Sequence, residues 1–286
     1  MYSGFVADIL MRGEVALTGA IFRVSLGFLV GALTLLAVSL YLSVYYLEER
    51  QPRLAAAGDT EGALQAAQTA ARLDPFDPEP LRSQSYLLQQ EGLDEEAARV
   101  LEAAIERGPH DYLTYQLLAN LQMTTLDNTD AAVENYRRAV ELNPKDNGLR
   151  TSLAQALIIK GDLEAAREEY EKLEENHRIS YEGLYDLGRI YVRTGEPAKG
   201  ATYIRRAKAR AAADVKRLEG PLRDAREDLI QSMDLALADA YVVQGRYSAA
   251  RKILEESPEP QAPALLELLN TDPEEYRESV VNSDIY

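Results

Sequence analysis

The sequence predicts an all-α protein, with one N-terminal transmembrane helix followed by an α-solenoid of about five to six helix-turn-helix units. Three observations support this prediction: an uncharged apolar run, prolines that recur every 34 or 35 residues, and small residues that recur in phase with them. The predicted parts are an N-terminal juxtamembrane segment 1–23, a transmembrane helix 24–47, a repeat solenoid 48–258 with an insertion near 215–230, and an acidic C-terminal tail 259–286.

The apolar run begins at Val24 and ends at Leu47, and its 24 residues carry no charge. As a helix it is ~36 Å long, enough to cross a hydrocarbon core of roughly 30 Å. Amphipathic rings favour the headgroup level, and three tyrosines lie near its end: Tyr41, Tyr45 and Tyr46. A cleaved signal peptide, which has a shorter apolar stretch, and a buried core helix are the alternatives.

Residues before and within this run indicate how it contacts the membrane and which way it is oriented. The apolar residues of segment 1–23 predict a short interfacial helix, and Gly27 and Gly31 have the spacing that lets two helices approach closely in lipid. Arg23 directly abuts the run and favours an N-terminus in the cytoplasm. The repeat domain is then expected on the extracytoplasmic side, with residues 24–47 contacting the bilayer.

Beyond the membrane segment the chain repeats itself. Pro75, Pro109 and Pro144 lie 34 and 35 residues apart. Small residues recur in phase at Ala63, Ala97, Ala132, Ala166 and Gly200, and Ala250 follows after 50 residues. Turn glycines, such as Gly161, end the first helix of a unit, and proline cannot continue the second, so each unit is predicted to be a helical hairpin. The hairpins bury their apolar stripes against one another.

These residues resemble the tetratricopeptide repeat (TPR), over residues 47–258. The fifth unit carries much of the pattern, with Leu184, Leu187, Gly188, Tyr191, Gly195, Gly200, Ile204 and Ala207. The third unit has one extra residue near its turn and lacks the turn glycine. The resemblance implies a right-handed superhelix whose concave groove, lined by the first helices, holds peptides or partner proteins.

The resemblance also implies groove positions in this chain. They are Arg82, Tyr86, Gln116, Asn120, Met123, Thr151, Gln155, Tyr185, Arg189 and Arg193. The lysines with which some members clamp terminal carboxylates are absent, although Asn120 fits one position of that clamp. The hypothesis is a groove for a polar, aromatic-containing segment, with Arg82, Arg189 and Arg193 available for acidic groups. The alternative is that all ten are ordinary solvated residues.

Two further segments have alternative interpretations. The insertion is rich in lysine and arginine and contains Gly220-Pro221, which predicts two longer paired helices that are either a solvated extension or a docking site. The tail predicts short helices around 263–269 and from Asp272 onward. They either cap the last repeat or form an interaction tail.

Composition limits the function. The net charge of -16 argues against nucleic-acid binding, and the absence of cysteine excludes thiolate chemistry. No phosphate loop or hydrolase motif is present, and His110 and His177 lie far apart in the sequence, so we expect neither an enzyme nor a metal site nor a cofactor. The sequence predicts a scaffold for protein partners, acting as an adaptor or assembly factor for a membrane-associated complex. The alternative is a permanent structural subunit of such a complex, held by other membrane subunits.

Overall fold

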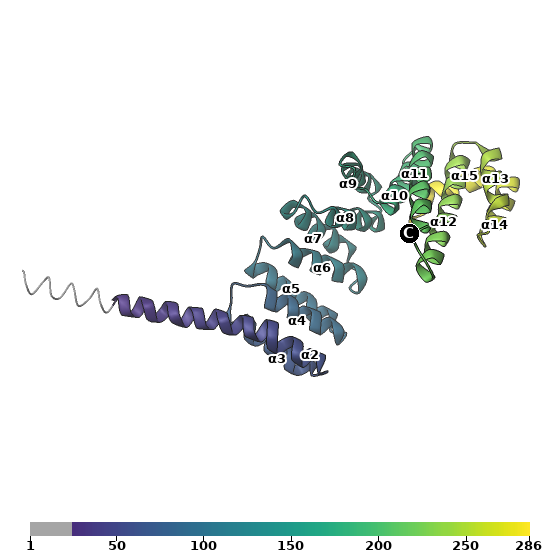
Figure 1. The fold of residues 1–286 in the computed structure, drawn as a ribbon. Coiled ribbons are helices and arrows are strands. Elements are labelled where there is room, and N and C mark those ends of the chain that lie inside the picture. The colour runs from purple at the N-terminus through teal and green to yellow at the C-terminus, as the bar shows by residue number, and fades with distance from the viewer. Residues whose placement is uncertain (1–24) are drawn as a thin grey trace, which may run out of the picture. The chain divides into compact units, whose positions relative to one another are not determined.

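The computed structural model describes residues 25–286, and all regular structure in that part of the chain is helical, as predicted. The predictions for segment 1–23 and Val24 lie outside the described residues. The chain divides into two compact units, of which the first extends to His110 and the second begins at Asp111 (Figure 1).

The first unit begins with a continuous helix, Ser25–Ala56. This helix contains a π-helical turn, η1 (Tyr45–Arg50), and ends with α2 (Gln51–Ala56). It is followed by α3 (Thr60–Leu73), α4 (Glu79–Gln90) and α5 (Asp94–Arg107). Helix Ser25–Ala56 is long and apolar enough to cross a membrane, a test that a signal sequence also passes.

The second half of helix Ser25–Ala56 packs against α3. Ser39 Oγ donates a hydrogen bond to the Leu73 carbonyl at 2.7 Å, and the buried Ser43 donates to the Ala70 carbonyl at 3.0 Å. From Ser25 to Val38, by contrast, every side chain is exposed. The packing of the first hairpin therefore starts at Ser39, two turns earlier than the leading helix from about Leu47 that the repeat pattern predicts.

The second unit is a stack of helical hairpins followed by two short helices. Its helices are α6 (Tyr112–Thr124), α7 (Thr129–Leu142), α8 (Asn147–Lys160), α9 (Leu163–Glu175), α10 (Tyr181–Arg193), α11 (Pro197–Val215), α12 (Pro221–Val243), α13 (Tyr247–Glu256), α14 (Ala262–Thr271) and α15 (Pro273–Asn282). One continuous apolar core runs from α6 to Ile285, near the end of the chain.

Turns and caps follow from the local sequence. Gly161 ends α8 at a φ of 85°, a left-handed conformation that glycine adopts without a steric cost. In the hairpin that lacks this glycine, Asp127 takes the turn position at a φ of 47°, which aspartate tolerates better than most residues. Asp162 and Ser180 cap α9 and α10 through side-chain bonds to backbone N–H groups.

The recurrent small residues lie where paired helices cross. Ala132, Ala166 and Ala250 are fully buried, as expected for residues that set the distance between two helices. At the crossing of α10 and α11, Gly188 and Gly200 face each other without side chains. A Cβ atom at Gly200 would lie 2.6 Å from the Gly188 carbonyl oxygen. The repeat period is therefore a packing requirement as well as a pattern of turns.

The basic insertion lengthens α11 and α12, and its charges pair with nearby acids. Lys208 Nζ lies 2.5 Å from an Asp234 carboxylate oxygen, and Arg226 lies 3.7 Å from Asp214 on the facing helix. Arg210 donates to the Ile179 carbonyl at 3.0 Å. Longer paired helices are present as predicted, and these three cations are paired within the second unit.

Candidate functional site: the α10 face and the C-terminal segment

The candidate site is the face of α10 that contacts the last four residues of the chain, Ser283–Tyr286, here called the C-terminal segment. Arg193 Nε donates to the Ser283 carbonyl at 2.9 Å, and its Nη2 contacts Ser283 Oγ at 3.0 Å and the Asp284 carbonyl at 3.3 Å. Arg189 donates to the Ile285 carbonyl. Three successive main-chain carbonyls are thus held by two arginine side chains.

Asp186, one turn before Arg189, holds the end of the segment. It is buried, and its Oδ2 accepts hydrogen bonds from Tyr170 at 2.9 Å and from Tyr286 at 2.7 Å. Burial raises the pKa of this carboxyl, and the bonds from Tyr286 and Tyr170 and the charge of Arg189 oppose that rise. The guanidinium carbon of Arg189 lies over the Tyr286 ring, 5.7 Å from the ring centroid.

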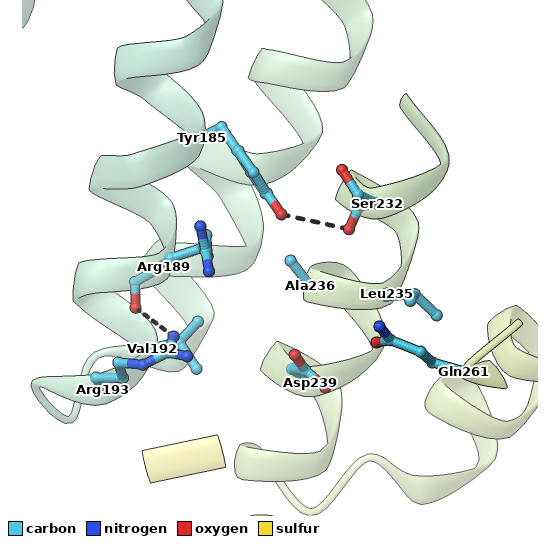
Figure 2. Close-up of a pocket in the computed structure, with 9 residues that line it drawn as sticks. All are labelled: Tyr185, Arg189, Val192, Arg193, Ser232, Leu235, Ala236, Asp239 and Gln261. Carbon is cyan, nitrogen blue, oxygen red and sulfur yellow. Dashed lines mark hydrogen bonds between the residues drawn. The ribbon is translucent and has the colours of Figure 1, made fainter. Parts of the chain in front are cut away.

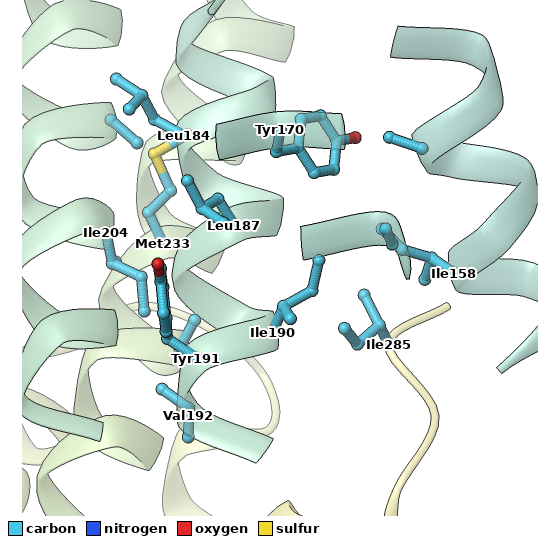
Figure 3. Close-up of a cluster of buried hydrophobic side chains, with 14 of the residues drawn as sticks. Ile158, Tyr170, Leu184, Leu187, Ile190, Tyr191, Val192, Ile204, Met233 and Ile285 are labelled. Carbon is cyan, nitrogen blue, oxygen red and sulfur yellow. The ribbon is translucent and has the colours of Figure 1, made fainter. Parts of the chain in front are cut away.

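Helix geometry places these groups on one face. Asp186, Arg189 and Arg193 are three and four residues apart, so they project from the same side of α10. Between the polar contacts, Ile285 inserts into the core and is 4% exposed. In Figure 3 its side chain points toward Ile158 of α8 and Ile190 of α10. The arrangement combines backbone recognition with one apolar pocket and one acceptor for a phenol.

Helix α15 packs against α12 and α10 and so brings the segment to this face. Its Tyr276 is almost fully buried and donates to Asp239 of α12 at 2.8 Å. Burial, together with the Asp239 charge, raises the pKa of Tyr276, and burial also raises the pKa of Asp239. Val280, one turn later, is buried as well. The helix is thus fixed by its own side chains, independently of the four residues that follow it.

A cleft of about 180 Å³ lies beside these contacts, between α10 and α12 (Figure 2). Its lining includes Tyr185, Arg189 and Arg193 from α10 and Asp239 from α12. Tyr185 donates to the Ser232 carbonyl at 3.4 Å across the cleft, and the Arg189 guanidinium lies 5.1 Å from its ring centroid. The cleft has room for about one side chain and does not hold a longer ligand.

The ten groove positions implied by the resemblance lie on four helices. Arg82 and Tyr86 lie on α4 of the first unit, where Arg82 is 3.9 Å from Glu79 and Tyr86 is exposed. The other eight lie in the second unit: Gln116, Asn120 and Met123 on α6, Thr151 and Gln155 on α8, and Tyr185, Arg189 and Arg193 on α10. The structure brings the three α10 residues together at the cleft. Asn120 accepts from Tyr136, and Gln155 is exposed.

Sequence reasoning missed Asp186, Asp239 and the C-terminal segment. One signal for Asp186 was available, since it interrupts the apolar stripe of α10 and precedes Arg189 by three residues. A signal for the segment was the pair Ile285-Tyr286 directly after the polar run Asn282-Ser283-Asp284. Nothing in the sequence placed the two together. Among residues 25–286, no group of three or more His, Asp or Glu is arranged to hold a metal ion.

Comparison with known proteins identifies the repeats. The sequence profile of the tetratricopeptide repeat matches residues 117–178 and 153–215, which lie within α6–α11. The chain therefore contains TPR repeats in its second unit. No curated protein sequence matches the chain.

Many solved structures resemble the fold. A crystal structure of MamA aligns with a TM-score of 0.53 at 20% identity, covering 63% of this chain and 97% of that one. MamA from Desulfovibrio magneticus aligns at 0.51 and 19% identity, covering 60% and 96%. A TPR protein from Parabacteroides merdae aligns at 0.50 and 16% identity, covering 80% and 99%. At these identities the likeness concerns the fold: the chain is an all-helical, TPR-like solenoid.

Proposed function

We propose that this chain is a membrane-anchored TPR scaffold that binds a protein partner, as an adaptor or assembly factor for a membrane-associated complex. The observation that carries the proposal is the α10 face, where Arg189 and Arg193 hold successive main-chain carbonyls of an extended segment. TPR repeats are scaffolds of this kind, stacking hairpins so that one helix of each faces a common binding surface. We propose the eight groove positions on α6, α8 and α10 as that surface in the second unit, and Arg82 and Tyr86 as the equivalent positions of the first unit.

The N-terminal helix supports the membrane part of the proposal. Side chains from Ser25 to Val38 are exposed although most are apolar, and burying them in lipid removes that apolar surface from water. Because Ser39 and Ser43 pack on the end of α3, we place the bilayer surface near Ser39. Residues 25–38 are about 21 Å long as a helix, which is most of a span of roughly 30 Å.

The turn after α3 gives a test of this placement. Ser39 bonds to Leu73, so the α3–α4 turn and its Phe76, which is 82% exposed, lie at the same height along the helix. The chain has no tryptophan, and Phe76→Trp therefore introduces a single reporter. We expect brominated lipid to quench its fluorescence in vesicles. Leu93→Trp, at the opposite end of the α3–α4 hairpin, is the matched control and should stay unquenched; equal quenching of both would contradict the placement.

The side of the membrane that carries the repeats needs a separate measurement. We propose the extracytoplasmic side, from Arg23 at the start of the apolar run. Because the chain has no cysteine, Glu168→Cys on the exposed face of α9 gives one thiol for labelling. An impermeant maleimide added to intact cells should label it; labelling only after lysis would assign the repeats to the cytoplasm.

Purification of the full chain in mild detergent tests partner binding. A transient adaptor is expected to recover several partners at substoichiometric amounts, whereas one partner at a constant ratio would identify a permanent subunit instead. Gln155→Arg on the exposed groove side of α8 should lower partner recovery. Glu168→Arg, also exposed but on the second helix of the same hairpin, should leave it unchanged. Equal recovery with both variants would contradict the choice of groove.

A further inference from the structure

The C-terminal segment differs from the helix that precedes it. α15 ends at Asn282, and the backbone of Ser283 turns extended at a ψ of 149°. Beyond that point only Ile285 is buried, and Tyr286 remains 61% exposed although its hydroxyl reaches Asp186. α15 itself is anchored by Tyr276 and Val280. The last four residues can therefore leave the α10 face while α15 stays in place.

The contacts of the segment are those of a bound peptide. Its backbone carbonyls accept from Arg189 and Arg193, a mode that any extended chain satisfies. Its side chains then add selectivity. Ile285 fills an apolar pocket, and the Tyr286 phenol donates to a buried carboxylate. In chain order, the face recognises an aliphatic residue followed by a tyrosine.

We propose that the C-terminal segment is an intramolecular ligand of the α10 face, and that a protein partner carrying an extended aliphatic–tyrosine sequence displaces it. This inference rests on the proposed function, since it names the class of partner that the scaffold binds. The segment thereby raises the threshold for binding, because a partner without this sequence neither fills the pocket of Ile285 nor bonds to Asp186.

Tethering sets the size of the effect. A segment joined to its site through α15 acts at an effective concentration on the order of millimolar. A free peptide with the same sequence and a Kd of tens of micromolar must compete against it. We therefore expect removal of the segment to tighten binding of that peptide at least ~10-fold.

The experiment uses the full chain in detergent and a variant that ends at Asn282. A fluorescent peptide with the sequence of residues 282–286, Asn-Ser-Asp-Ile-Tyr, is titrated into each, and anisotropy is read. The shortened variant should bind it at least ~10-fold more tightly than the full chain. Asp186→Ala in the shortened variant, or phenylalanine in place of the peptide's tyrosine, should weaken binding. Equal binding to both chains would overturn the proposal.

Two controls distinguish an intramolecular ligand from a structural cap and from a dimer contact. Ile285→Asp releases the segment without shortening the chain and should give the same gain in peptide affinity. A large loss of helical circular dichroism in both this variant and the shortened one would mark the segment as a structural cap and overturn the proposal. Dimerisation of the full chain that the shortened variant lacks would assign the face to a second copy and would overturn it too. Peptide binding that fails while partners still co-purify refutes this inference alone, and peptide binding without any partner refutes the proposed function alone.

Discussion

The crossing of α10 and α11 allows a sharp test of the packing. Gly200→Ala would place a Cβ atom 2.6 Å from the Gly188 carbonyl oxygen and 2.7 Å from Val192 Cγ2. Ordinary contacts begin at 3.4 Å, so the two backbones must separate by about 0.8 Å. Overpacking of this kind costs about 1–3 kcal/mol, and the higher helix propensity of alanine returns about 1 kcal/mol. Because the obstacle is backbone rather than a flexible side chain, we expect an overpacking cost of about 2–3 kcal/mol, in the upper half of this range, and thus a net loss of about 1–2 kcal/mol.

Gly148→Ala is the matched control. Gly148 lies in the first turn of α8, where an added Cβ meets only the Asp146 side chain, at 3.1 Å. Asp146 caps α8 by accepting from the Gly148 and Leu149 N–H groups, but it needs to shift by only about 0.3 Å to reach an ordinary contact, so we expect little loss and a gain of at most about 1 kcal/mol. The assay is urea denaturation of the full chain in detergent, followed by helical circular dichroism. A midpoint for Gly200→Ala equal to or above that of Gly148→Ala would refute the reasoning.

Three other predictions concern a buried hydrogen bond, a strained turn and the dependence of stability on pH. Tyr276→Phe removes the bond to Asp239 and should lower the free energy of unfolding by about 1–3 kcal/mol, whereas Tyr247→Phe removes an exposed bond to Glu274 and should change it little in the same urea assay. Gly161→Ala forces a side chain into a φ of 85° and should cost about 1 kcal/mol, in contrast to Gly148→Ala. Burial raises the folded-state pKa values of Asp186 and Asp239, so their contribution to stability is present below the unfolded pKa near 4 and is lost as pH rises through the folded pKa. A variant with both Asp186→Asn and Asp239→Asn should therefore lose less stability than the native chain between about pH 4 and pH 7. An unchanged slope of the free energy of unfolding against pH would contradict the raised pKa values.

The hairpins could be predicted because their signals are local. Gly161 and the recurrent prolines mark where helices end, and the buried alanines mark where helices cross, all within one repeat of each other. The start of the first hairpin was harder to place. The apolar run and the leading helix form one continuous helix without a break, so only the bonds from Ser39 and Ser43 to α3 mark where repeat packing begins.

The docking of the C-terminal segment was not predictable for a different reason. Arg193 and Ser283 are 90 residues apart, and Asp186 and Tyr286 are 100 residues apart. No periodicity links such positions, because the contact depends on where α12 and α15 carry the chain end. The position of Asp186 in the apolar stripe of α10 indicates that it is unusual, but its partners, the phenols of Tyr170 and Tyr286, become evident only in the structure.

The chemistry of the α10 face also separates affinity from selectivity. The sequence-based hypothesis assigns Arg189 and Arg193 to acidic groups of a partner, whereas in the structure both donate to carbonyl oxygens that every peptide has. Arginines used in this way hold an extended chain but do not choose it. Selection must then come from the pocket filled by Ile285 and from Asp186, whose Oδ2 accepts one phenol from the core and one from the ligand. A ligand lacking the second phenol would leave this buried carboxylate one hydrogen bond short, and that deficit is what gives the face a preference for tyrosine.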